Sequence, residues 1–185
     1  MSKDPSNVRD GEVGLEPADL VHFEDPLEVI ANDHTRVRAA CEVIDRLAKA
    51  DAPKRGDLGD VIAFMENRLP LVLRDEDDDL HVLLRRRCDA EDEIEKTLVR
   101  LRDDHVKATS AMPRLLDALK DMENTGRAAT FEEQNDLVHF ASALRKHIIV
   151  ENAIVLPLAR FRLTKDDRAE LRDHMIARRA AALKG

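Results

Sequence analysis

The sequence has no Trp, no Tyr and only 6 Gly among its 185 residues. Strands draw on aromatic and β-branched residues, so this scarcity argues against a sheet-rich protein. The chain is instead rich in Ala, Leu, Asp, Glu and Arg, a composition that is typical of long helices. We therefore expect an all-α protein with almost no sheet.

The sequence also lacks the features of secreted and membrane proteins. It has 2 Cys, no long apolar run, and no N-terminus in which charged residues precede an apolar stretch. These absences argue against a disulfide scaffold, a membrane span and a secretion signal. We expect a cytoplasmic protein, and the length fits one domain with its own core.

Basic residues are fewer than acidic ones, with 30 Lys and Arg against 38 Asp and Glu. The net charge of −8 and the isoelectric point near 5.4 repel a phosphate backbone or an anionic lipid surface. The short basic run at residues 85–87 stands among acids. We therefore expect neither a nucleic acid nor a membrane as a partner, and the pattern leaves the oligomeric state open.

Helical periodicity divides the chain into two parts. Residues 1–24 mix Pro, Gly and acids with no sustained period, so we expect a tail or a short leading segment. Residues 25–183 carry four long amphipathic stretches with short joins and then a shorter fifth one, at about 26–50, 58–88, 92–124, 131–157 and 165–182. This order predicts an up-down-up-down four-helix bundle with a short extra C-terminal helix.

Capping residues and prolines mark the ends and bends of these helices. Asp25 and Asp57 are expected to cap the first two helices, and Thr130 with Glu133 forms a capping box for the fourth. Pro70 lies inside the second stretch, where its missing N–H predicts a kink.

Each long helix has an apolar stripe, and each stripe is interrupted at a core position by an ionisable residue. The interruptions are His34, Glu76, His105, His147 and Glu151. Counting residues back from the turns that join the first two and the last two helices places all five at about the same depth. A buried carboxylate without a partner is unfavourable by several kcal/mol, so this layer requires a compensating charge.

A metal ion is one such compensating charge. A single His on an apolar face is more often an ordinary core residue than a ligand, but three His and two Glu at one depth favour a metal site. Imidazoles and carboxylates together suit iron, manganese or zinc. A centre that is reached from four helices can hold two ions bridged by carboxylates.

Several segments together resemble one known family. They are DPLEVIANDH, LPLVLRDEDDDL, RDDH, LRKHIIVENAIVLPLA and MIARR, and they resemble bacterial hemerythrin-like proteins of the HHE cation-binding family over residues 25–180. The resemblance implies a hemerythrin-like bundle with a non-heme di-iron centre that interacts with O2, NO or peroxide. Carried over position by position, it implies metal ligands at His34, Glu76, His105, His147 and Glu151.

One position departs from the family pattern. The second helix of the family carries His four residues before the glutamate, and this chain has Val72 there. Valine cannot coordinate a metal, so a one-iron or altered site becomes an alternative to the di-iron centre. Regular helical spacing argues against His81 as a substitute, because five residues place it on another side of the helix from Glu76. Asp75 and Asp79 point closer to the gap, although a solvated acidic face is the favoured interpretation.

The other His and Cys residues are predicted to have ordinary roles. His139 is expected to be half-exposed, with a supporting position behind the ligands as the alternative. His22, His81 and His174 have no partner spacing and are expected at the surface. Cys41 shares a face with His34 and is expected to be a buried, inert thiol.

Three functions remain open at this point. The first is an iron-binding protein whose centre meets O2, NO or peroxide for sensing, storage or scavenging. The second is an enzyme that consumes peroxide or oxygen at the same centre, which requires an open coordination position. The third is a metal-depleted bundle that acts as a regulatory or protein-interaction module. No nucleophile elbow, phosphate-binding Gly-rich loop or catalytic triad pattern supports a hydrolase or a kinase.

Overall fold

The computed structural model describes residues 25–183, and within that range every regular element is helical. The expected all-α bundle with an extra C-terminal helix is therefore confirmed. The predictions for residues 1–24, including a surface position for His22, fall outside the described residues. Among the described residues, no helix is long and apolar enough to cross a membrane.

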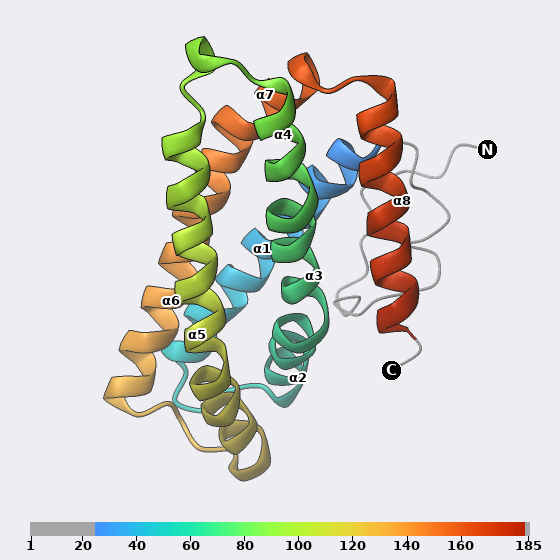
Figure 1. Cartoon of the computed structure of the whole chain (residues 1–185). Coiled ribbons are helices and arrows are strands. Elements are labelled where there is room, and N and C mark those ends of the chain that lie inside the picture. The colour runs from blue at the N-terminus through green and yellow to red at the C-terminus, as the bar shows by residue number, and fades with distance from the viewer. Residues whose placement is uncertain (1–24, 184–185) are drawn as a thin grey trace, which may run out of the picture.

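Four long helical stretches alternate in direction, and a shorter helix packs against their outside (Figure 1). The first is α1 (Pro26–Ala48), and the third is α5 (Glu95–Thr125), which follows the short turn η4 (Ala90–Asp92). The second joins α2 (Arg55–Ala63), η2 (Phe64–Arg68), α3 (Leu69–Arg74), η3 (Asp75–Leu80) and α4 (His81–Arg87). The fourth joins α6 (Phe131–Val150), η5 (Glu151–Val155) and α7 (Leu156–Arg162), and α8 (Lys165–Ala182) closes the chain.

Side-chain hydrogen bonds cap the starts of α1, α6 and α8. The Asp25 carboxylate accepts a hydrogen bond from the backbone N–H of Leu27 at 3.0 Å, which caps α1 as expected. The capping box of Thr130 and Glu133 is present at the start of α6. The expected cap at Asp57 is wrong, because α2 begins at Arg55 and Asp57 lies in its first turn. A carboxylate there still interacts favourably with the helix dipole.

The core consists of two apolar clusters with a polar layer between them. One cluster includes Val37, Leu73, Ala108 and Leu144, and the other includes Ile30, Leu80, Leu101 and Val155. Along each long helical stretch, an ionisable residue lies between members of the two clusters, namely His34, Glu76, His105, and the pair His147 and Glu151. All five are at most 3% exposed, so the predicted burial of these residues is confirmed.

The three segments η2, η3 and η5 are π-helical turns, in which backbone bonds span five residues instead of four. The N–H groups of Leu69, His81 and Leu156 donate to the carbonyls five residues earlier. Pro70 and Pro157 follow two of these segments, and each lacks the N–H that would continue the regular ladder. A π-helical turn thus lies just before Pro70, where the sequence predicts a kink.

The π-helical turn at η5 changes which residues face the core. Regular spacing places Ile154 and Leu158 beside Glu151, but Ile154 is 45% exposed and Leu158 is only partly buried. Val155 and Ala159 are fully buried instead. The buried positions after Glu151 are therefore displaced by one residue from regular spacing, because a π-helical turn inserts one extra residue into the helical repeat.

The last helix, α8, packs against η3 and α1 and forms a buried ionic network with them. Arg179 donates to Asp33 at 3.0 Å and lies 2.7 Å from Asp75, while Arg178 pairs with Asp75 and with Asp79. Asp75 is 1% exposed and Asp79 is 7% exposed. Neither prediction for the two aspartates is correct, because they are buried partners of α8 arginines and not a solvated face or substitute ligands.

Candidate metal centre

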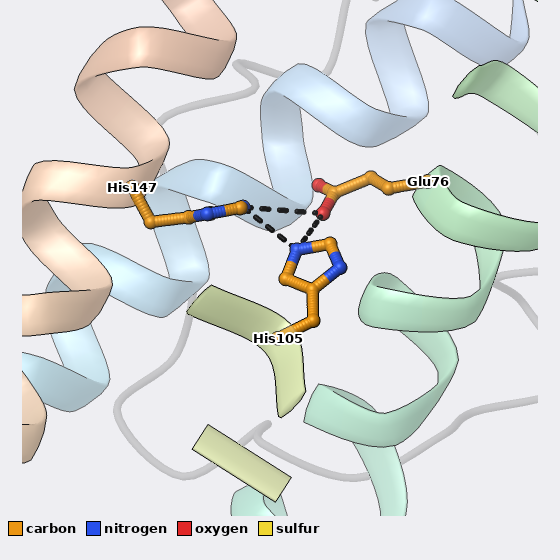
Figure 2. A group of neighbouring side chains, drawn as sticks. All are labelled: Glu76, His105 and His147. Atoms are coloured by element: carbon orange, nitrogen blue, oxygen red, sulfur yellow. Dashed lines mark hydrogen bonds and ion pairs between the residues drawn. The ribbon is translucent and has the colours of Figure 1, made fainter. Parts of the chain in front are cut away.

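Glu76, His105 and His147 form the centre of the polar layer, and their side chains converge from η3, α5 and α6 (Figure 2). The Nε2 atoms of the two imidazoles are 2.8 Å apart. The Oε2 atom of Glu76 lies 3.1 Å from Nε2 of His105 and 3.5 Å from Nε2 of His147. Donor atoms about 2.1 Å from one ion lie roughly 3.0–3.4 Å from each other. The three distances here, 2.8–3.5 Å, are close to that range, so small side-chain shifts would allow the three atoms to bind a common metal.

His34 extends this cluster from α1. Its Nε2 atom donates to Oε1 of Glu76 at 2.7 Å, so the glutamate contacts imidazoles on both of its oxygens. Its Nδ1 atom donates to the amide oxygen of Asn152 at 3.0 Å. Asn152 therefore fixes the orientation of the His34 ring, a role that the sequence analysis did not predict.

Glu151 has its own imidazole partner, and that partner is His81. The Nε2 atom of His81 lies 2.9 Å from Oε1 of Glu151, and both side chains are at most 1% exposed. The expected surface position of His81 is therefore wrong. The reason is the backbone of η3, where the N–H of His81 bonds to the carbonyl of Glu76 and brings positions five residues apart onto one side of the helix.

Asp77 contacts the Nδ1 atoms of two of these imidazoles. One of its carboxylate oxygens lies 3.0 Å from Nδ1 of His105, and the other lies 3.4 Å from Nδ1 of His81. The His81 and His105 rings are nearly parallel, with centroids 6.1 Å apart. The sequence analysis did not single out Asp77, because the dense acidic run around it has no helical period that separates one member from the others.

All four imidazoles are oriented in the same way. In each of them, Nε2 faces a carboxylate oxygen of Glu76 or Glu151. Nδ1 faces an oxygen further from the centre, which belongs to Asn152 for His34 and to Asp77 for His81 and His105. For His147 the nearest such oxygen is that of Asp104, at 3.9 Å. Metal-binding histidines usually contact a carboxylate or carbonyl through the nitrogen that does not bind the metal. For His34, His81 and His105, the outer oxygen lies within 3.4 Å of Nδ1, which favours a proton on that nitrogen and binding of a metal through Nε2.

The pKa values show how strongly these groups are coupled without a metal. Burial lowers the pKa of His81 and His105, but contacts with Asp77 and with the glutamates outweigh burial and raise the pKa values to about 9 and about 10. Burial likewise opposes protonation of His34, yet Glu76 raises its pKa. Burial raises the pKa of Glu76, but three imidazole contacts hold it well below its usual range. Imidazolium charges thus compensate the buried carboxylates where a cation otherwise would.

The donor set fits a transition metal ion in charge and in chemistry. Imidazole nitrogens and carboxylate oxygens are ligands that iron, manganese and zinc accept. The Oε2 atom of Glu151 is buried and has no hydrogen-bond partner among the described residues. Buried carboxylate oxygens are rarely left unpaired, so this atom is suited to a positively charged ligand.

A cavity of about 230 Å³ extends from the centre toward the surface between α5 and α6. His105 and His147 border it, and so do small or apolar residues, including Ala108, Ala111 and Leu144. His139, which was expected to be half-exposed, is exposed and lies along the same cavity. The cavity gives small molecules a way to approach the imidazole side of the centre.

The model of the hemerythrin HHE cation-binding domain matches residues 25–159 of the chain. The chain belongs to this family. The match covers more than half of the chain, and it includes the five buried residues of the polar layer and His81. No curated protein and no solved structure matches the chain.

The hemerythrin family match confirms the resemblance that the sequence motifs indicated. Together with the cluster of Glu76, His105 and His147, it identifies a helical domain of a cation-binding family with a candidate site in its core. Position 72 of this hemerythrin-like chain is a buried valine that is 3% exposed and offers no donor.

The two remaining residues of interest lie outside the centre. Cys41 is a buried free thiol, and burial raises its pKa to about 12, which agrees with the expected inert role. His174 is 54% exposed, as expected, and its Nδ1 atom contacts Asp79 at 2.6 Å.

Proposed function

We propose that this protein is a non-heme iron-binding protein whose core centre interacts with O2, NO or peroxide. The proposed metal ligands are His34, Glu76, His105, His147 and Glu151. The observation that carries the proposal is the shared orientation of the imidazoles, with Nε2 turned toward buried glutamates and Nδ1 turned toward outer oxygens. A core of satisfied histidines has no need of this arrangement, whereas a metal centre does.

Iron is the proposed metal because of the donor chemistry and the family. Mixed imidazole and carboxylate ligands in a helical bundle are typical of non-heme iron centres. When bound, iron supplies the electron-rich centre to which a diatomic molecule or peroxide attaches. The chain itself holds the ligand imidazoles in place, excludes bulk water through the two apolar clusters, and admits small molecules through the cavity between α5 and α6.

The proposed ligand is small and uncharged or weakly charged. The cavity of about 230 Å³ has room for such molecules, and its inner end is formed by His105 and His147. A net charge of −8 opposes nucleic acid as an alternative partner. We place this function in the cytoplasm, and the free thiols of Cys41 and Cys88 support a reducing compartment.

Metal analysis of protein that is produced with added iron tests the proposal. We expect iron to co-purify, and we expect the iron-loaded protein to change its visible absorption on exposure to O2, NO or peroxide. Protein that takes up no iron from anaerobic ferrous solution would favour the metal-depleted interaction module instead.

A second candidate function is an enzyme that consumes peroxide or oxygen. The cavity favours it, because a turnover site needs a route by which substrate enters and product leaves. Sustained peroxide loss that scales with iron content would support the enzyme. A single stoichiometric spectral change without turnover would support binding, sensing or storage.

A further inference from the structure

The metal centre lacks one imidazole at the position where the family pattern expects it. Val72 is buried and carries no donor atom, so α3 contributes no ligand at this position. Any further imidazole for the layer must then come from another position in the chain. The structure provides such an imidazole in His81, with Nε2 at 2.9 Å from Oε1 of Glu151.

The π-helical segment η3 is the reason that His81 reaches the layer. In a regular α-helix, five residues rotate the side chain by about 500°, so His81 would point roughly 140° away from Glu76. The bond from the His81 N–H to the Glu76 carbonyl replaces that geometry with a wider turn. The segment thereby presents Glu76 and His81 to the same layer from one helix.

We propose that His81 is a metal ligand of this protein and supplies the imidazole that Val72 cannot. This inference rests on the proposed metal-binding function and extends it to a residue outside the family pattern. With His81, the layer contains four imidazoles and two glutamates, which is enough for a centre of two ions. Nε2 loses its proton when it binds the metal, and Nδ1 keeps its proton toward Asp77.

The environment of His81 matches that of the other imidazoles. Asp77 contacts Nδ1 of both His81 and His105, so one carboxylate orients two rings that lie nearly parallel. His81 and Glu151 form the same kind of pair as His34 and Glu76. The distance from Nε2 to Oε1 is 2.9 Å in the first pair and 2.7 Å in the second. The second carboxylate oxygen of Glu151 is buried and has no hydrogen-bond partner among the described residues.

A purely structural ion pair between His81 and Glu151 is the competing explanation. Replacement by glutamine separates the two, because the Gln side chain can still donate a hydrogen bond to Glu151 but is a poor ligand for iron. His81→Gln therefore preserves the structural contact and removes the ligand. His81→Ala removes both and serves as the second variant.

The experiment measures iron stoichiometry after anaerobic loading with ferrous iron, and it measures the visible spectrum after loading with Co(II). We expect about two ions per chain in the parent and about one in His81→Gln and His81→Ala, with a changed Co(II) spectrum. His174→Gln is the matched control, since His174 is exposed and contacts Asp79 instead of the layer. Far-UV circular dichroism checks that every variant is folded.

The outcomes separate this inference from the function on which it rests. A parent that binds no metal overturns both. A parent that binds metal, together with a His81→Gln variant of the same stoichiometry and the same Co(II) spectrum, overturns only the role of His81. A loss in His174→Gln equal to that in His81→Gln would also overturn it, because the effect would then not depend on the layer.

Discussion

In the histidines of the polar layer, the two ring nitrogens face different partners: Nε2 faces a glutamate, and Nδ1 faces a residue further from the centre. Nδ1 of His34 contacts a neutral amide, while Nδ1 of His81 and of His105 contacts the Asp77 carboxylate. A carboxylate behind the ring makes the opposite nitrogen a stronger donor to a metal than an amide does. We therefore expect the rings that Asp77 contacts to be stronger donors to a metal than the ring that Asn152 contacts.

His147 is the residue whose loss we expect to affect metal binding most directly. Its Nε2 atom lies beside both His105 and Glu76, at 2.8 Å and 3.5 Å. His147→Ala should lose most bound iron and keep its helical content, because the change removes a ligand and leaves the apolar clusters intact. Metal analysis and far-UV circular dichroism measure the two effects. His139→Ala is the control, and unchanged iron in His147→Ala would exclude this residue from the site.

The substitution Val72→His tests whether a further imidazole in the layer increases metal binding. The sequence pattern alone predicts that Val72→His adds a second ion, but His81 already supplies an imidazole to the layer. We now expect Val72→His to bind no additional iron and to unfold more easily by about 1–3 kcal/mol, since a polar ring replaces a buried valine. Iron stoichiometry and denaturant unfolding measure this. An extra ion with recovered stability would show that position 72 does face the centre.

At the scale of helices, π-helical turns change the faces that the helices present to the core. η3 brings His81 to the layer and η5 replaces Ile154 by Val155 in the core. Two glutamates of the layer, Glu76 and Glu151, lie inside these segments. π-helical turns are frequent at functional sites, and here they orient the carboxylates of the candidate centre.

The capping box of α6 provides a pH-dependent contribution to stability. Hydrogen bonds from Arg127 hold the pKa of Glu133 at about 2, below its usual 4.5. A lowered folded-state pKa stabilises the fold above pH 4.5, and this contribution is lost as the pH falls toward 2. Glu133→Gln should therefore lower the free energy of unfolding by about 1 kcal/mol at neutral pH, and the difference should shrink in acid.

Denaturant unfolding at a series of values between about pH 7 and pH 3 checks this dependence. Glu132→Gln is the matched control, because Glu132 is exposed and its ion pair with Arg114 spans 3.9 Å. A difference between the parent and Glu133→Gln that stays constant with pH would contradict the role of the Glu133 charge.

At the scale of the whole molecule, the centre and the fold depend on each other. The polar layer separates the two apolar clusters, and α8 fastens η3 to α1 through Arg179, Asp75 and Asp33. Removing one member of such a buried network typically destabilises a protein by about 3–5 kcal/mol. The ionic contacts of α8 therefore help to hold the segment that carries Glu76 and His81.

Metal binding should consequently stabilise the whole bundle. A ligand that binds only the folded state adds about 2.7 kcal/mol at a free concentration 100 times its dissociation constant. For a chain of this size we expect iron to raise the melting temperature by roughly 5–10 °C under that condition. Calorimetry of iron-loaded and chelated protein measures the shift, which His147→Ala should abolish. Equal melting temperatures in the parent would argue against binding in the core.

The sequence by itself determined the helical class, the buried positions of His34, Glu76, His105, His147 and Glu151, and the family. The helical class and the buried positions follow from side-chain periodicity and composition, which act along each helix and are visible in a single chain. The family follows from the resemblance of several short motifs to known proteins. Helix caps such as Thr130 with Glu133 were equally predictable, because their contacts span only three residues.

Only the tertiary structure decided the place of His81, the partners of Asp75 and the change of core face after Glu151. The first and third depend on backbone bonds that span five residues, and regular α-helical spacing cannot represent them. The second depends on arginines about a hundred positions further along the chain, which only the packing of α8 brings to η3. Local patterns determine the apolar face of each regular helix, whereas π-helical turns and long-range packing determine which further charged residues are buried and which of them meet.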